Sequence, residues 1–233
     1  FVGHPLADDI PMVSDKQQAR KVLNLPSEKK ILALMPGSRN GELSRLLEPF
    51  FKSAEQLQQE DDNLLLIAPM VSEKRAAQFN SIKSELSPDL KVDVIIDRTQ
   101  AAMAASDCLL TASGTVTLEA ALIKRPMVIC YRFNMLTHLL AKWLVKLKWF
   151  SLPNLLANET LVPELLQDEV CPERIVPLVK ERLYNDQNQL NNSFNKIHQQ
   201  LKCNASEQAA KAVIDLLNLS KIEHPQLNKT PYG

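Results

Sequence analysis

Residues 31–39 read ILALMPGSR, an apolar run of five residues that passes directly into a turn with proline and glycine. An apolar run of this length, bounded by turn residues, is typical of a strand covered on both faces of a parallel sheet. Similar runs follow at residues 64–68, 92–96, 108–111 and 127–130, and helical patterns lie between them at 42–59, 72–86, 99–105 and 115–123. This alternation predicts an α/β fold built on a doubly wound parallel sheet.

The two ends of the chain have a different character. After residue 131 the sequence predicts helices at 136–148, 163–166, 172–184, 187–203 and 206–217, and residues 5–26 suggest a linker with one short helix near 15–23. We therefore expect an interdomain linker and hinge at 1–27, a Rossmann-like domain at 28–150, C-terminal helices at 151–220 and a flexible tail at 221–233. Because the chain opens on Phe1 and its start reads as the end of a strand, we expect that the N-terminal part of a longer protein is missing.

The composition excludes several classes of protein. With 27 basic and 27 acidic side chains, the chain lacks the positive field of a nucleic-acid-binding protein, so no nucleic-acid partner is expected. Its four cysteines form no C-x-x-C pair, which favours buried free thiols over a disulfide or a metal site. No run of about 18 apolar residues is present, and the sequence therefore predicts a soluble protein that is at most peripheral to a membrane.

The turn after the first predicted strand has the chemistry of a phosphate site. Gly37 allows close approach of the backbone, the start of the next helix offers free N–H groups beside Ser38, and Arg39 supplies a forked cation. An ordinary strand-to-helix turn with a capping side chain remains the alternative.

A second loop of the same type joins the run at 108–111 to the helix at 115–123. Gly114 permits close approach, and Ser113 and Thr115 offer hydroxyl groups at a helix start that favours a diphosphate. Glu119 lies one turn further along this helix, where its carboxylate could accept both hydroxyl groups of a ribose. The alternative for Glu119 is a carboxylate that faces solvent.

Both loops are expected at one edge of the sheet, because right-handed crossovers bring the carboxyl ends of parallel strands together. Together they predict a site for a nucleoside diphosphate. Neither loop has the G-x-x-x-x-G-K-[ST] or G-x-G-x-x-G pattern, which argues against ATP hydrolysis and dinucleotide redox chemistry. No cluster has metal-ligand spacing, so we expect a cationic site without a metal or another cofactor.

Several motifs, in chain order, resemble the lipid-A-disaccharide synthase family of GT-B glycosyltransferases. They are FVGHPL (1–6), PGSR (36–39) with Glu42, ASGT (112–115) with LE (118–119), SLPN (151–154), and CNA (203–205) with EQAA (207–210). The resemblance covers residues 1–217. It identifies the chain as the C-terminal, nucleotide-sugar-binding part of such an enzyme.

The resemblance also implies roles for individual residues. Substrate-binding roles fall on Ser38 and Arg39 with the diphosphate, on Ser113, Gly114 and Thr115 with phosphate or proximal sugar, on Glu119 with ribose, and on Glu42. His4 and Asn154 are the candidate catalytic residues, near a cleft between domains. For His4 the alternative is a hinge residue that is hydrogen-bonded to backbone.

The activity implied by the resemblance is the transfer of an acylated glucosamine from UDP-2,3-diacylglucosamine to lipid X, with release of UDP. The family's N-terminal domain, which would hold the general base, is not in this sequence, so the fragment is expected to be inactive alone. A UDP-sugar epimerase of similar fold and a non-catalytic nucleotide-sugar or membrane-docking module are the alternatives. A homodimer is also compatible with the sequence.

A local asymmetry of charge suggests a surface that contacts an anionic membrane. Residues 120–158 contain no Asp or Glu, and at 135–150 they form an apolar helical pattern with Trp143, Trp149 and Phe150. The basic side chains of this predicted surface are Lys124, Arg125, Arg132, Lys142, Lys146 and Lys148. This composition suits a helix at a lipid interface, and the alternative is a core helix whose lysines face water. With a lipid substrate, the expected location is cytoplasmic, peripheral to the inner membrane.

Overall fold

The computed structural model of the chain describes residues 1–132 and 148–222. Within them lies a six-stranded parallel sheet with the strand order β3-β2-β1-β4-β5-β6. The chain therefore reverses its direction of winding between β1 and β4, and open α/β sheets bind ligands at such a switch point. The strands are β1 Ile31–Met35, β2 Leu65–Met70, β3 Asp93–Ile96, β4 Cys108–Ala112, β5 Met127–Tyr131 and β6 Glu164–Leu166.

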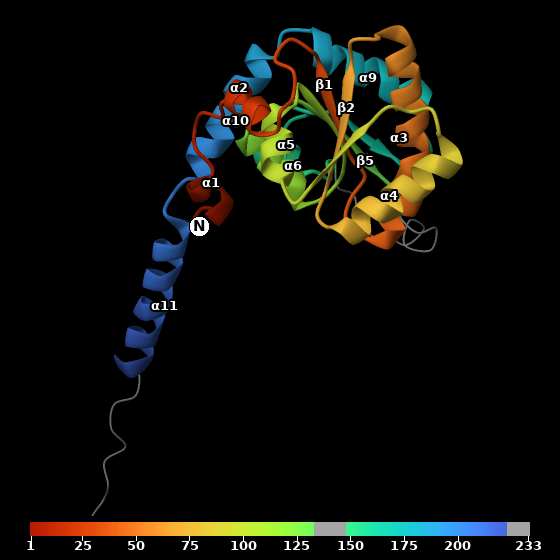
Figure 1. The fold of residues 1–233 in the computed structure, drawn as a ribbon. Coiled ribbons are helices and arrows are strands. Elements are labelled where there is room, and N and C mark those ends of the chain that lie inside the picture. The colour runs from red at the N-terminus through yellow and green to blue at the C-terminus, as the bar shows by residue number, and fades with distance from the viewer. Residues whose placement is uncertain (133–147, 223–233) are drawn as a thin grey trace, which may run out of the picture.

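Helices cover both faces of this sheet, as Figure 1 shows. One face carries α3 (Asn40–Glu60), α4 (Glu73–Leu86) and α9 (Pro172–Tyr184). The other carries α5 (Thr99–Ala105), α6 (Thr115–Leu122) and α10 (Asn188–Leu201), with α1 (Pro5–Asp9) packed beside them. The doubly wound fold predicted from the sequence is thus confirmed.

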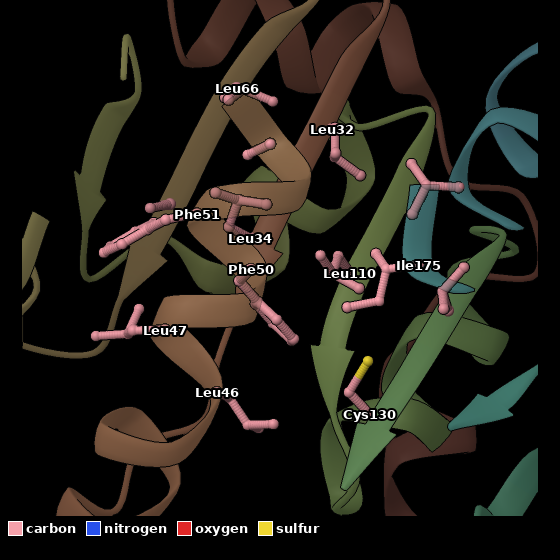
Figure 2. Packing of buried hydrophobic residues seen from close by; sticks show 14 of the residues in the cluster. Leu32, Leu34, Leu46, Leu47, Phe50, Phe51, Leu66, Leu110, Cys130 and Ile175 are labelled. Atoms are coloured by element: carbon pink, nitrogen blue, oxygen red, sulfur yellow. The ribbon is translucent and has the colours of Figure 1, made fainter. Parts of the chain in front are cut away.

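The strands read as continuous apolar runs because alternate side chains enter different cores. In β1, Leu32 and Leu34 pack under α3 and α9, whereas Ile31, Ala33 and Met35 pack under α5 and α6. Figure 2 shows the first core, in which α3 brings large side chains against the middle of the sheet. The ring of Phe51 meets that of Phe79 from α4 edge-on, with centroids 5.2 Å apart. Two apolar layers therefore fix the sheet from which the strand-end loops project.

The helix predicted at 163–166 is wrong, because these residues form the edge strand β6. Leu165 is paired with Cys130 and Leu166 with Tyr131, and Ile129 N donates a hydrogen bond to the carbonyl of Pro163. A segment this short has little preference of its own, so pairing with β5 decides its conformation. The local patterns of the sequence also did not predict α1 and α8 (Leu152–Ala157). The predicted helix at 136–148 falls almost wholly on residues 133–147, outside the described residues, as does most of the predicted tail.

Two residues of the predicted basic surface are buried. Lys124 donates to Leu122 O at 2.7 Å, and Arg125 donates to Ala104 O at 2.7 Å. Burial lowers the pKa of Lys124 to about 8. Because these cations satisfy backbone carbonyls inside the protein, they do not belong to an exposed surface.

The N-terminal segment is attached to the last helices of the chain. The carboxylate of Asp8 accepts hydrogen bonds from Asn204 N at 2.9 Å and Ala205 N at 2.6 Å, at the start of α11 (Ala205–Ile222). Gly3 lies against the backbone of Leu201, and His4 N donates to Leu201 O at 2.9 Å. In Figure 1 α11 then points away from the sheet domain.

Candidate functional site

A cavity of about 550 Å³ opens at the carboxyl edge of the sheet, between the loops that follow β1, β2, β3 and β4. Its volume lies within the range of small-molecule sites. All seven residues predicted to bind substrate line it, which brings two distant loops of the sequence together. The lining residues are Met35, Gly37, Ser38, Arg39, Glu42, Pro69, Met70, Val71, Arg75, Thr99, Ala112, Ser113, Gly114, Thr115, Val116 and Glu119.

The loop after β1 is held in shape by Glu42 from the first turn of α3. Its carboxylate accepts a hydrogen bond from Arg39 N at 3.3 Å and lies 3.5 Å from Arg39 Nη1. The side chain of Arg39 is 85% exposed, so it can turn toward a ligand at little cost. Glu42 thus lies in the cavity wall, and its described contacts are with the loop itself, so its substrate-binding role stays a prediction.

The loop after β1 requires a glycine at position 37. Its φ is +102°, and a Cβ there would lie 2.4 Å from Glu42 Oε2 and 2.9 Å from Glu42 Cβ. We expect Gly37→Ala to lower the free energy of unfolding by about 1–3 kcal/mol through backbone strain and displacement of Glu42. Urea unfolding measures this cost.

Gly114 provides a matched control for Gly37. Its φ of 165° is extended, and no atom lies within 4 Å of an added Cβ. Gly114→Ala should therefore leave stability unchanged and act only on the open space of the cavity. An equal loss of stability in both variants would contradict the assignment of strain to Gly37.

The loop after β4 presents the start of α6 to the same space. Ser113 N donates to Cys130 O at 3.1 Å, and Thr117 Oγ1 donates to Gly114 O at 2.7 Å, which fixes the loop. Gly114 and Thr115 are exposed, and Ser113 is half-buried. The first N–H groups of a helix are free to bind an anion, so this arrangement suits a phosphate group.

Glu119 is a half-buried carboxylate in the cavity wall. Burial raises its pKa above the ordinary value for a glutamate, because water solvates the charge incompletely. Within residues 1–132 and 148–222, no hydrogen bond or ion pair engages this carboxylate. A desolvated acceptor of this kind is suited to hydroxyl groups of a ligand.

Arg75 and the end of β2 also line the cavity, and the sequence analysis missed both. Arg75 belongs to the first turn of α4, and its Nη1 donates to Gln78 Oε1 at 2.7 Å. Pro69, Met70 and Val71 form a largely apolar wall next to it, with Thr99 from the start of α5. The signal that could have found them is the shared edge at which all strand-to-helix loops of a parallel sheet open.

The structure places His4 and Asn154 outside this cavity. His4 caps α1, and its Nδ1 accepts a hydrogen bond from Leu6 N at 3.2 Å, as in the alternative considered for it. Asn154 is fully buried and bonds to Val162 O, Glu164 Oε1, Leu161 N and Val162 N at 2.8–3.0 Å. These four bonds use both donors and both acceptor positions of its amide. The catalytic roles suggested for His4 and Asn154 stay predictions.

Among residues 1–132 and 148–222, no group of three or more His, Cys, Asp or Glu side chains is arranged to hold a metal ion. No helix of that part of the chain is long and apolar enough to cross a membrane.

Comparison with known proteins confirms the family suggested by the motifs. A family model described as Lipid-A-disaccharide synthetase matches residues 1–213. The lipid-A-disaccharide synthase of Colwellia psychrerythraea strain 34H is 72% identical over 218 residues, which cover 94% of this chain and 56% of that relative. The corresponding enzyme of Haemophilus influenzae strain PittGG is 44% identical, over 93% of this chain and 57% of its own length. The chain thus spans somewhat more than half the length of these relatives.

Solved structures share the fold at low sequence identity. S. aureus MnaA in complex with UDP gives a TM-score of 0.60 at 15% identity, over 94% of this chain and 54% of that one. The C-terminal CMP-Kdo binding domain of WaaA from Acinetobacter baumannii gives 0.53 at 12% identity, over 79% of this chain and 96% of that domain. These likenesses establish the architecture of a GT-B C-terminal domain. The family model matches residues 1–213 of this chain, and a lipid-A-disaccharide synthase is 72% identical to it. The chain therefore belongs to the lipid-A-disaccharide synthetase family.

Proposed function

We propose that this chain is the donor-binding part of a lipid-A-disaccharide synthase and that its cavity binds UDP-2,3-diacylglucosamine. One observation carries the proposal: two loops with phosphate chemistry surround the same space as the carboxylate of Glu119, which no other described residue engages. Ser38, Arg39 and the start of α6 would hold the diphosphate, and Glu119 would accept the ribose hydroxyl groups. The proposed site lies at the switch point between β1 and β4, where open α/β sheets bind ligands.

The reaction proposed for the complete enzyme is an inverting displacement at the anomeric carbon of the donor sugar. The attacking hydroxyl group belongs to lipid X, and the bond from the anomeric carbon to the diphosphate breaks with release of UDP. Charge develops on the departing diphosphate, where Arg39 and the helix N-termini would stabilise it. We expect turnover to require the part of the relatives that this chain does not span, which would supply the general base.

Family membership favours a transferase over the epimerase alternative. Binding of UDP distinguishes the proposed donor-binding part from a membrane-docking module, because a module that only docks on a membrane needs no nucleotide site. Since the proposed acceptor is a lipid, we also propose that the protein works at the cytoplasmic face of the inner membrane. The exposed Lys148, whose Nζ lies 4.5 Å from the ring centroid of Trp149, is compatible with that location.

The test is a calorimetric titration of the purified chain with UDP, without added metal. We expect saturable binding that weakens about five- to tenfold in Arg39→Ala, through loss of a charge-assisted hydrogen bond at an exposed position. Arg174→Ala is the matched control, because Arg174 is also an exposed arginine in a weak ion pair, at 3.9 Å from Glu169, and it lies outside the cavity. A folded chain that binds no UDP would overturn the proposal.

A further inference from the structure

We infer that Arg75 is a second diphosphate-binding cation of the cavity, directed at the phosphate distal to the ribose and positioned by Gln78. The inference rests on the proposed function, since it concerns the same nucleotide. It adds the loop after β2 to a site that the motifs place only on the loops after β1 and β4.

The start of α4 holds Arg75 in place. Ser72 caps the helix, and its side chain accepts a hydrogen bond from Arg75 N at 3.4 Å. One turn along, Gln78 Oε1 accepts from Arg75 Nη1 at 2.7 Å. The guanidinium is half-buried and lies in the cavity wall. Gln78 is a neutral amide, so this contact orients the guanidinium without placing a negative charge beside it.

The balance of charge in the cavity depends on Arg75. Four of the described lining residues are charged, namely Arg39, Arg75, Glu42 and Glu119. Without Arg75, one arginine would stand against two glutamates, and Glu42 already lies 3.5 Å from Arg39. A lining with a net negative charge would repel a diphosphate, which carries a negative charge on each phosphate group. With Arg75, two arginines balance two glutamates, and this repulsion is removed.

The order of the strands indicates which phosphate Arg75 reaches. Arg75 follows β2, and Glu119 follows β4, with β1 between the two strands. Two strand spacings separate these strand ends by about 10 Å. A nucleotide whose ribose lies at Glu119 and whose diphosphate crosses the switch point would extend its distal phosphate toward β2. The leaving UDP gains its additional charge on that phosphate, so Arg75 would also favour departure.

The experiment compares UDP with UMP, which lacks the distal phosphate, on the purified 233-residue chain. We expect Arg75→Ala to weaken UDP binding about tenfold and UMP binding less than about twofold. Arg75→Lys should give an intermediate loss, because it keeps the charge and loses the planar fork. Gln78→Ala should lower the preference for UDP over UMP without abolishing it, a change that a merely structural role would not produce.

Lys74→Ala is the matched control, since Lys74 is an exposed cation in the same helical turn and outside the lining. Equal losses in Lys74→Ala and Arg75→Ala would overturn the inference, because they would indicate a general effect of charge. Equal losses for UDP and UMP in Arg75→Ala would move the residue to another part of the nucleotide and also overturn it. Failure of the parent chain to bind UDP would instead remove the proposed function and this inference together.

Discussion

Glu119→Gln is expected to weaken UDP binding about 30- to 100-fold, a loss of about 2–3 kcal/mol. The amide keeps the size of the side chain but loses the charge and one of the two acceptor oxygens that would bind the ribose. Calorimetric titration of both proteins measures the change. Glu85→Gln, an exposed substitution on α4, controls for the loss of one negative charge. Unchanged affinity in Glu119→Gln would remove Glu119 from the nucleotide site.

The same substitution should make the ligand-free protein more stable at neutral pH. Burial raises the pKa of Glu119 above its usual value near 4.5, so the folded state holds this proton more tightly than the unfolded state does. The resulting stability is present below pH 4.5 and is lost as the pH rises through the folded-state pKa. Thermal unfolding of Glu119→Gln should lack this decline. A variant less stable than the parent at pH 7 would contradict it.

Asp107→Ala is expected to lower the free energy of unfolding by about 3–5 kcal/mol, because it leaves a buried cation without its partner. The Asp107 carboxylate accepts from Arg20 Nη2 at 2.6 Å, Lys16 Nζ at 2.7 Å and Ile31 N at 2.8 Å. The side chains of Arg20 and Asp107 are only 3% and 7% exposed. This cluster joins α2 (Lys16–Val22) to the beginning of the sheet. Urea unfolding at pH 7 measures the loss.

The pH dependence of Asp107→Ala distinguishes the ion pair from simple packing. Burial alone would raise the pKa of Asp107, but the hydrogen bonds from Lys16 and Ile31 and the charges of Lys16 and Arg20 outweigh it and lower the pKa. The stability due to this carboxylate is therefore present above the unfolded pKa near 3.8 and is lost as the pH falls through the folded value. The difference between variant and parent should shrink in acid.

Glu48→Ala is the control for Asp107→Ala. Glu48 pairs with Lys52 at 2.7 Å one turn along α3, but both side chains are more than half exposed. An exposed pair of this spacing contributes at most about 1 kcal/mol. A similar loss of stability in both variants would show that burial of the Asp107 cluster has no special effect.

The central part of the fold could be predicted from the sequence because its signals are local. Five apolar runs identify β1 to β5, and glycine-containing turns mark the loops that carry the site. The edge strand β6 has no such signal. Its Glu164 accepts hydrogen bonds from Phe150 N, Ser151 N, Ser151 Oγ and Asn154 Nδ2, so partners from a preceding loop and helix stabilise it. Contacts of this kind cannot be seen in the local pattern.

Arg75 and Asn154 show two limits of prediction from motifs. Arg75 lies in the segment SEKRAAQF, where charged residues on a helix are ordinarily solvated, and only the sheet edge brings it to the cavity. Asn154 belongs to a family motif, but the motif does not distinguish a catalytic role from a structural one. Its four hydrogen bonds within the described residues explain why an asparagine fits that position.

The bond between Asp8 and the start of α11 has a consequence for biosynthesis. It joins residues 197 positions apart, so the first helix finds its partner only after most of the chain has left the ribosome. At about 5–20 residues per second, that interval lasts about 10–40 s. The sheet can assemble in chain order during this time, whereas the N-terminal segment must wait. Slower translation therefore prolongs the time that α1 spends without its hydrogen bonds to the start of α11.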